Sequence, residues 1–396
     1  MNDNFILMHK TAPCGVLAVD RASGALTEFT LIDKQYAPFL GNANDELMKI
    51  WWNHRAVPES RKDMEVVVRL AGCDNNSGYL AKNLALSLTD TYWICPADIE
   101  LAWEDINLYK LSGNVQSIVP YHNGTSYDPN ASLGGQMNKY WDVSNSVPVL
   151  VKKAYEYYGQ QSINELFATE LHSRQNSGVP FASYYKRPAD DNAVLACCDS
   201  FTSEHIEFVS AYEVLSSRKL KTSISDYDQY LDICEENGLD RDMMQHSMDY
   251  MVLSDFAITN IDEHLQNFGL LRDADTMELI GPAPIFDFGN SMFFNERSSR
   301  PISRHEILEI TISSLHTSEE KMLRHLRDLT VVERQLLPTP EETEAFYYSH
   351  GLSEERAAFV AGCYKNKLDM LSDLQRGIKI SLYHEKQRDK KNSYNS

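Results

Sequence analysis

The sequence predicts an α+β protein of two lobes, a small β-rich N-lobe followed by a larger helical C-lobe. Short strand-like segments, separated by turn residues, dominate the first half of the chain. Helical patterning dominates from about Glu207 to the C-terminus, and only a strand-rich island at residues 268–287 interrupts it. The chain has 396 residues, 43% of them hydrophobic, so it can bury a sizeable core.

Composition and charge argue against several classes of protein. The net charge of 37 − 57 = −20 disfavours wrapping nucleic acid or lying on anionic lipid. The seven cysteines show no CxxC spacing, which is typical of reduced thiols in a cytoplasmic protein rather than of disulfides or a zinc site. No basic stretch precedes an apolar one at the N-terminus, and no apolar run approaches the roughly 20 residues of a membrane span. We therefore expect no signal peptide and no membrane segment.

Residues 1–110 are predicted to form a β/α extension that packs on the small lobe. Apolar side chains on one side of residues 45–55 predict a helix, and Pro58 opens a second helix that runs towards Leu70. The polar stretch at residues 112–135, rich in Gly and Asn, is the first candidate boundary and the best candidate for a mobile segment. Strands are expected before the helices, at residues 5–8, 15–19 and 25–30.

Residues 111–200 are predicted to form the small lobe, and residues 201–396 the larger helical lobe. A helix is expected at residues 162–175, with Ser162 as N-cap and Glu165 completing a capping box. Strands are expected around this helix, at residues 147–152, 181–185 and 193–197.

The sequence NIDEHLQN at residues 260–267, followed by DFG at residues 287–289, points to phosphoryl transfer. This reaction needs one carboxylate to orient the attacking hydroxyl, and an amide oxygen and a second carboxylate to hold Mg²⁺ on the phosphates. Asp262 precedes Asn267 by five residues, as in protein kinases, and Asp287 heads the DFG. We assign all three as catalytic, with Asn267 and Asp287 as the metal ligands.

A predicted hairpin connects the two motifs. Residues 268–272 and 277–280 alternate around a turn at residues 273–276, so the hairpin would return Asp287 to the neighbourhood of Asn267. Each motif alone is weak, because Asp and Asn are common in loops and caps, but their order and the hairpin favour a functional interpretation. We expect His264 to be structural or to face the substrate, because no second His lies at ligand spacing.

A kinase also needs a cation on the α/β phosphates, usually a strand lysine paired with a helix glutamate. Lys152 ends a predicted strand, and Glu165 on the following helix is its expected partner, with Glu170 as the alternative. A solvated strand end is the structural alternative for Lys152.

A phosphate loop is expected before this strand, in the sequence SLGGQMNK at residues 132–139. Gly134 and Gly135 would let the backbone approach phosphate oxygens and donate N–H groups. The chain contains neither G-x-G-x-x-G nor the Walker motif.

Together these segments resemble the HipA-like serine/threonine kinases, bacterial toxin-type kinases and their stand-alone relatives. Residues 262–268 are similar to the family's D-x-H-x-x-N-F catalytic loop, and residues 284–287 to its metal-binding segment. Residues 132–139 resemble its S-x-x-G-x-Q-x-K phosphate loop, while Val151-Lys152 and Asn164-Glu165 resemble its lysine strand and N-E helix. The similarity covers roughly residues 80–300. It departs from the family after Lys152, where Lys153-Ala154-Tyr155 stands in place of glycines.

The resemblance implies a two-lobed, protein-kinase-like fold, the cofactors ATP and Mg²⁺, and a protein substrate with a Ser/Thr acceptor. It implies that Ser132, Gly134, Gly135 and Gln136 bind the nucleotide, and that autophosphorylation of Ser132 ejects the loop and silences the enzyme. It places the adenine near residues 196–199, including Cys198, and implies an antitoxin-like protein partner.

Three functions follow as hypotheses. The first is an ATP-dependent protein serine/threonine kinase. The second is a nucleotide-binding regulatory module without turnover, a pseudokinase. The third is a phosphatidylinositol-type lipid kinase, against which the charge of −20 and the lack of a basic amphipathic surface helix weigh. The acceptor substrate and the oligomeric state are not encoded in these motifs.

Overall fold

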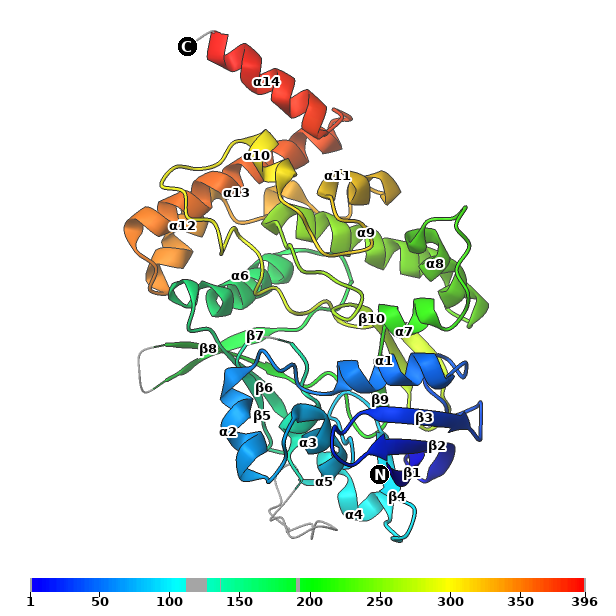
Figure 1. The fold of residues 1–396 in the computed structure, drawn as a ribbon. Helices are drawn as coiled ribbons and strands as arrows, with labels where there is room; N and C mark the ends of the chain where they lie inside the picture. Colours follow the sequence, from blue (N-terminus) through cyan, green and yellow to red (C-terminus); the bar gives the residue numbers. More distant parts are fainter. Residues whose placement is uncertain (1, 112–126, 136, 190–192, 395–396) are drawn as a thin grey trace. The chain divides into compact units, whose positions relative to one another are not determined.

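The computed structural model describes residues 2–111, 127–135, 137–189 and 193–394 as two compact units (Figure 1). We call Met1–Lys152, Cys197–Lys221 and Leu270–Ile280 the sheet-rich unit, and Lys153–Ala196, Thr222–Gly269 and Gly281–Ser396 the helical unit. The division at residues 110 and 200 that the sequence suggested stays an interpretation.

The sheet-rich unit contains an antiparallel four-stranded sheet of order β3-β2-β1-β4. Its first three strands confirm the sequence prediction, whereas the fourth was not predicted. All five residues of β4 are buried, so the strand lacks the alternation that reveals a half-buried strand. The strands are β1 (Asn2–His9), β2 (Ala12–Asp20), β3 (Leu26–Leu31) and β4 (Tyr92–Pro96).

Helix α1 (Asp45–Arg55) has the predicted bounds and packs against β3 (Figure 1). The Asn44 side chain caps it by accepting from the Leu47 N–H. Helix α2 (Lys62–Leu70) begins four residues after Pro58, so its predicted start was wrong. The residue before it, Arg61, instead turns its side chain into the protein. The other helices of this unit are α3 (Asn76–Lys82), α4 (Trp103–Ile106), α5 (Leu108–Leu111) and α7 (Ala211–Ser216).

A second sheet has the strand order β5-β6-β8-β7. Its strands β6 and β8 confirm the predictions at residues 147–152 and 193–197. The strand predicted at residues 181–185 begins later, at Tyr184. Phe181 forms only an isolated parallel bridge with Ile285. Part of the polar stretch expected to be mobile, residues 112–126, lies outside the described residues. The strands are β5 (Lys139–Asp142), β6 (Val149–Lys153), β7 (Tyr184–Pro188) and β8 (Val194–Asp199).

The third sheet, of order β11-β10-β9, contains the predicted hairpin. Its strands are β10 (Gly269–Asp273) and β11 (Leu279–Pro282), and the Asp273 N–H donates to the Glu278 carbonyl at the turn. Strand β9 (Ile206–Ser210) corrects the expectation of helix from Glu207 onward. Glu207 is fully buried and paired with Arg272. A charged residue on the buried face interrupts the alternation of apolar and polar residues by which a strand is recognised in a sequence.

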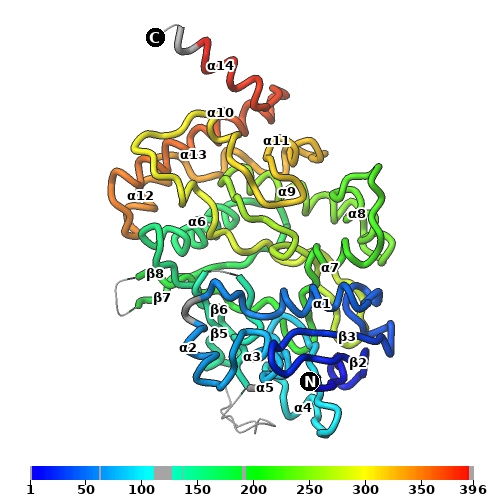
Figure 2. Tube along the Cα trace, viewed as in Figure 1, coloured from blue at the N-terminus to red at the C-terminus, as the bar shows by residue number. Residues whose placement is uncertain are grey.

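The helical unit is built around buried helix α9, which packs against α8 and α13, while α13 packs against α12 (Figure 2). None of the helices in the described part of the chain is both long and apolar enough to cross a membrane. The helices are α6 (Gln160–Arg174), α8 (Asp226–Glu236), α9 (Arg241–Ile258), α10 (Arg304–Glu309), α11 (Glu319–Met322), α12 (Pro340–Ser349), α13 (Glu354–Gln375) and α14 (Leu382–Tyr394).

The start of α6 differs from the prediction. Its N-cap is Gly159, whose φ of 76° lies in the left-handed region, and the helix begins at Gln160. Ser162 is therefore inside the helix, and the predicted capping box with Glu165 was wrong. The Ser162 hydroxyl oxygen accepts instead from the Ala154 N–H, 3.0 Å away. Glu165 does not cap the helix and instead accepts a hydrogen bond from the backbone of the DFG segment.

Candidate active site

The loop that carries Asp262 is tied to the end of α9 by a buried amide. The helix ends at Ile258, and its C-cap residue, Thr259, has a φ of 51°. The next residue, Asn260, donates from Nδ2 to Asp255 Oδ1 and to Glu263 Oε2, each at 3.0 Å. Its Oδ1 accepts from the Asp262 N–H at 3.3 Å. These bonds fix the direction in which the chain enters the loop.

The predicted five-residue spacing closes a loop between Asp262 and Asn267. Asn267 Nδ2 donates to the main-chain carbonyl of Asp262 at 2.8 Å, and its own N–H donates to the His264 carbonyl at 2.7 Å. Because Nδ2 makes the bond within the loop, the carbonyl oxygen Oδ1 is the atom that Asn267 can offer to a cation. The His264 Nδ1 accepts from the Gln266 N–H, which supports a structural role for this histidine.

The DFG segment returns to the loop that carries Asp262, as the hairpin prediction requires. The Ile261 N–H donates to the Asn290 carbonyl at 3.0 Å, and the Met292 N–H to the Ile258 carbonyl at 2.8 Å. Asn290 Nδ2 also donates to Asp262 Oδ2 at 2.7 Å. The hairpin thus brings the segment that begins at Asp287 against the loop of Asp262.

Charge and backbone geometry at Asp287 agree with a functional position. The pKa of Glu263 is raised well above its ordinary value, first by burial, then by the charges of Asp255 and Asp287. Asp287 itself has a φ of 66°, in the left-handed region that residues with a Cβ rarely occupy. Such a conformation costs about 1–2 kcal/mol and is concentrated at functional sites.

Helix α6 holds the DFG segment through consecutive polar side chains. Glu165, which is fully buried, accepts the Phe288 N–H on Oε2 at 2.9 Å. Asn164 Nδ2 donates to the carbonyls of Gly289 at 2.8 Å and of Ser291 at 2.7 Å. These bonds fix the backbone that follows Asp287.

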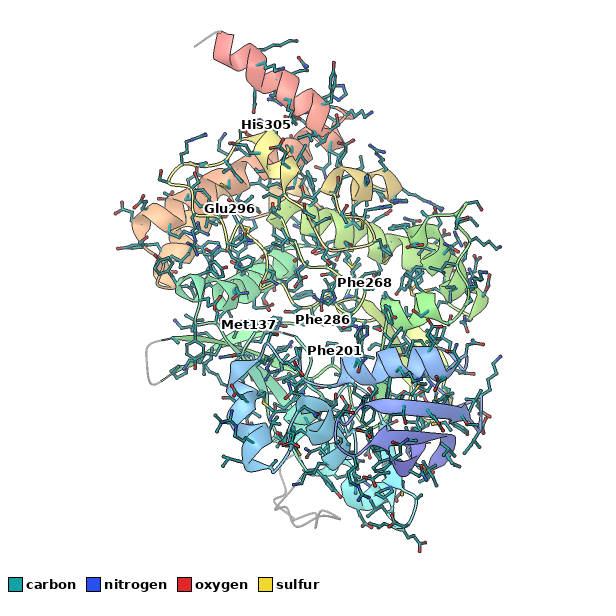
Figure 3. The ribbon with its side chains drawn as sticks, viewed as in Figure 1. Met137, Phe201, Phe268, Phe286, Glu296 and His305 are labelled. Carbon is teal, nitrogen blue, oxygen red and sulfur yellow. The ribbon has the colours of Figure 1, made fainter. Side chains whose placement is uncertain are left out.

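The Phe288 ring packs on His172, also from α6, with ring centroids 4.9 Å apart. Burial lowers the pKa of His172 to about 3, so the ring is neutral and behaves as part of the apolar core. Phe268 and Phe286, at the two ends of the hairpin, belong to the same unit and are labelled in Figure 3.

In the sheet-rich unit, a buried arginine holds both ends of the predicted phosphate loop. Arg61, 2% exposed, donates from Nη1 to the Leu133 carbonyl at 2.9 Å and from Nη2 to the Lys139 carbonyl at 2.8 Å. Ser132, at the start of the loop, donates from Oγ to the Leu86 carbonyl at 2.7 Å. Sequence reasoning missed Arg61, because no local pattern distinguishes it from a solvated arginine. Gln136 lies outside the described residues.

The two glycines of this loop differ. Gly135 has a φ of 88°, and a Cβ there would lie 2.5 Å from the ammonium nitrogen of Lys139. At Gly134 a Cβ would have no neighbour nearer than 3.9 Å. The loop thus passes close to the Lys139 ammonium at one glycine and leaves the other with an open side.

Lys152 is 1% exposed and pairs in register with Lys139 across β5 and β6. Directly opposed residues of an antiparallel pair share a face, so the two lysines lie on the same side of the sheet. Lys139 also lies close to Gly135, and ammonium groups next to a glycine loop are suited to phosphate. Cys198 is 6% exposed on β8, and its contact with adenine stays a prediction.

Lys152 and Glu165 belong to different units, so their pairing stays a prediction. The alternative partner, Glu170, is exposed and pairs with Arg174 at 2.9 Å. Within the described residues, no group of three or more His, Cys, Asp or Glu is arranged to hold a metal. Asn267 and Asp287 still offer oxygen donors that fit Mg²⁺. This ion commonly takes only one or two ligands from the protein, and phosphate and water oxygens complete its coordination.

Comparison with known proteins gives no matching family profile and no matching curated protein. Among solved structures, HipA of Shewanella oneidensis MR-1, from a toxin–antitoxin complex with HipB and operator DNA, aligns with 94% of this chain and 97% of its own. The TM-score is 0.53 and the identity 14%. The Helicobacter pylori proinflammatory kinase CtkA aligns with 62% of this chain and 97% of its own, at 14% identity and a TM-score of 0.47. The chain has the HipA-like, two-lobed kinase fold, which confirms the predicted fold class.

Proposed function

We propose that this protein is an ATP- and Mg²⁺-dependent protein serine/threonine kinase of the HipA-like type. The observation that carries the proposal is the contact between the catalytic loop and the DFG segment. Asp262 accepts a hydrogen bond from the side chain of Asn290, three residues after Asp287. Asn267 donates to the main-chain carbonyl of Asp262 in the same loop. A HipA-like fold and a buried lysine beside a glycine loop support it.

Each residue has a role in this reaction. Asp262 orients the acceptor hydroxyl and accepts its proton as the oxygen attacks the γ-phosphorus and ADP leaves. Asn267 Oδ1 and the Asp287 carboxylate would hold Mg²⁺, which neutralises charge on the phosphates when bound. Lys152 and Lys139 compensate the phosphate charge, and the N–H groups around Gly134 and Gly135 donate to phosphate oxygens.

Transfer of radiolabelled γ-phosphate, to the protein itself and to a cytosolic extract, tests the proposal. Asp262→Ala is expected to lower the rate about 10²–10⁴-fold. The matched control is Asp242→Ala, which removes an exposed carboxylate near the N-terminus of α9. Equal labelling by wild type and Asp262→Ala would refute the assignment. Binding of Mg²⁺-ATP without turnover would indicate a pseudokinase instead.

Autophosphorylation of Ser132 is the proposed form of regulation. The hydroxyl donates to the Leu86 carbonyl, and a phosphate ester has no hydrogen to donate there. Mass spectrometry would detect it as an increase of about 80 Da on Ser132 that is lost in Asp262→Ala. Detection of the same phosphate in Asp262→Ala would assign it to another kinase.

An antitoxin-like protein partner also remains part of the proposal. The HipA neighbour was solved with HipB and operator DNA. The charge of −20 argues that this chain itself makes no extensive contact with DNA. Fluorescence anisotropy with a duplex at physiological salt should therefore show no binding by the isolated protein.

A further inference from the structure

Asn290 lies between helix α6 and the carboxylate of Asp262. Gln161, on α6, donates from Nε2 to Asn290 Oδ1 at 2.7 Å. Asn290 in turn donates from Nδ2 to Asp262 Oδ2 at 2.7 Å. The three side chains thus form a chain of two short hydrogen bonds that runs from a helix to the proposed catalytic acid–base group, all within the helical unit.

The order of donors and acceptors in this chain is determined by chemistry. The Asp262 carboxylate only accepts, so Asn290 must present its NH₂ group to it. The carbonyl oxygen of Asn290 then faces Gln161, which must donate. Gln161 therefore sets which way the Asn290 amide is turned. With the amide reversed, an oxygen would face the carboxylate and repel it.

A bond to Oδ2 also sets the orientation of the Asp262 carboxyl group. The last torsion of an aspartate is broad, so the carboxylate of a half-buried side chain rotates unless it is held. With Oδ2 bound to Asn290, Oδ1 is the oxygen left to meet an acceptor hydroxyl. A misplacement of about 1 Å in such a group can lower a rate about 10²-fold.

We propose that Asn290 is a positioning residue for Asp262, and that Gln161 holds Asn290 in the orientation this requires. The proposal rests on the kinase function proposed above. It assigns a second role to α6, which already holds the backbone after Asp287 through Asn164 and Glu165. One helix then positions both the metal-binding segment and the catalytic carboxylate, so a displacement of α6 would disturb both together.

A purely structural role for Asn290 can be separated from this one. The two segments are already joined by main-chain bonds, from the Ile261 N–H to the Asn290 carbonyl and from the Met292 N–H to the Ile258 carbonyl. Truncation of the Asn290 side chain leaves these bonds in place. Asn290→Ala should therefore fold, and its defect should be in catalysis rather than in nucleotide binding.

The first experiment measures kcat and the KM for ATP in Asn290→Ala, Gln161→Ala and the double variant. Asn290→Ala is expected to lower kcat about 10–100-fold with little change in KM, since a lost positioning contact acts on the chemical step. Gln161→Ala should lower it less. The double variant should match Asn290→Ala, because Gln161 acts only through Asn290. Multiplicative effects of the two changes on kcat would overturn the proposal.

Gln161→Glu is the sharpest variant. Its carboxylate accepts but does not donate, so it favours the reversed Asn290 amide and turns Nδ2 away from Asp262. It should lower kcat more than Gln161→Ala, and should lose this extra effect in the Asn290→Ala background. Gln335→Glu, at an exposed position, adds the same charge and should leave kcat unchanged. A Gln161→Glu variant as active as wild type would contradict the donor order.

A second experiment needs no turnover. The Tm values of Asp262→Ala, Asn290→Ala and their double variant should be non-additive, because each single change removes the same hydrogen bond. Additive shifts would overturn the positioning contact even in an inactive protein. An inactive wild type with non-additive shifts would refute only the proposed function, whereas an active wild type with additive shifts would refute only the role of Asn290.

Discussion

At the scale of single residues, substitutions of Asp287 can distinguish the effect of its backbone conformation from the effect of its charge. Its left-handed φ of 66° is tolerated by Asn better than by Ala. Asp287→Asn should therefore keep the fold while it removes the metal-binding charge. Asp287→Ala should remove the charge and also lose roughly 1 kcal/mol of unfolding free energy. The two variants thus report on different properties of one position.

Phosphate transfer and thermal unfolding of both variants check this prediction. Both should lose Mg²⁺-dependent transfer, and only Asp287→Ala should unfold at a lower temperature than wild type. Full transfer by Asp287→Asn would contradict the metal role. Equal stability of the two variants would show that the φ value carries no strain.

Asp255 lies near the end of α9 and accepts a hydrogen bond from Asn260, just before the loop that carries Asp262. Burial raises its pKa to about 7, from an ordinary value near 3.8. The folded protein therefore holds a proton that the unfolded chain releases between about pH 4 and pH 7. This contribution to stability is full below about pH 4, falls as the pH rises towards 7, and is constant above that.

Asp255→Asn does not titrate, and its Oδ1 can still accept from Asn260. The Tm of the variant relative to wild type should therefore increase from pH 4 to pH 8, by roughly 1–2 °C for each kcal/mol that ionisation of Asp255 costs the wild-type protein. Circular dichroism melts at several pH values measure this difference. A constant difference would mean that Asp255 titrates alike in both states.

At the scale of elements, the glycine loop offers two neighbouring positions with different steric demands. A methyl group at Gly134 would meet nothing nearer than 3.9 Å, whereas at Gly135 it would displace Lys139 and strain a φ of 88°. Gly134→Ala should therefore leave Tm unchanged and weaken ATP binding, because a side chain keeps phosphate from the backbone. Gly135→Ala should lower both.

Isothermal titration with a non-hydrolysable ATP analogue, beside thermal unfolding, measures these effects. Gly78→Ala is a suitable control for the added methyl group, since a Cβ there would make only an ordinary contact at 3.5 Å, with the Asn75 side chain. Undiminished affinity in Gly134→Ala would contradict close approach of phosphate to this loop.

The elements also show how far the sequence predicts this fold. Helix α1 was predicted with its observed bounds, because its apolar residues follow one face and its cap is local. Strands β4 and β9 escaped prediction, since β4 is buried on both faces and β9 carries the buried Glu207. The start of α6 was misplaced because Ser162 and Glu165 have the spacing of a capping box, whereas Ser162 lies inside the helix and its hydroxyl oxygen accepts from the Ala154 N–H.

In the candidate site, too, some residues could be recognised from the sequence and others could not. The catalytic roles of Asp262, Asn267 and Asp287 stay predictions, but these residues could be recognised as candidates in the sequence, because phosphoryl transfer needs their types at a fixed spacing. Arg61 and Asn290 could not, because each acquires its role from a partner far away in sequence, the phosphate loop in one case and Asp262 in the other. Their roles depend on tertiary contacts that no local pattern encodes.

At the scale of the whole molecule, the two units are interleaved along the chain, which crosses between them after residues 152, 196, 221, 269 and 280. The sheet-rich unit is completed by later segments. Glu207, from β9, binds His9 at 2.9 Å and Arg272, from β10, at 2.7 Å, all three side chains being buried. A buried charge that loses its partner is strongly destabilising, so a fragment that ends before β9 would lack an essential part of this unit.

Because the protein has a net charge of −20, the overall field and the cations at the nucleotide site act in opposite directions on an anionic ligand. An anionic nucleotide must bind to an acidic protein, so cations at the site have to overcome an unfavourable background. Lys152→Met and Lys391→Met both change the net charge from −20 to −21, and therefore alter the overall field equally. Lys152 is buried beside the glycine loop, whereas Lys391 is exposed in α14.

Lys152→Met should raise the Kd for Mg²⁺-ATP roughly 10–100-fold, the equivalent of about 1.5–3 kcal/mol for a charge-assisted hydrogen bond. Lys391→Met should leave it within about twofold, because at physiological salt a distant exposed charge is screened. Titration calorimetry at 0.15 M salt compares the two, with Tm as the check that each variant folds. Equal effects of the two variants would mean that the overall field, and not a local phosphate site at Lys152, governs nucleotide binding.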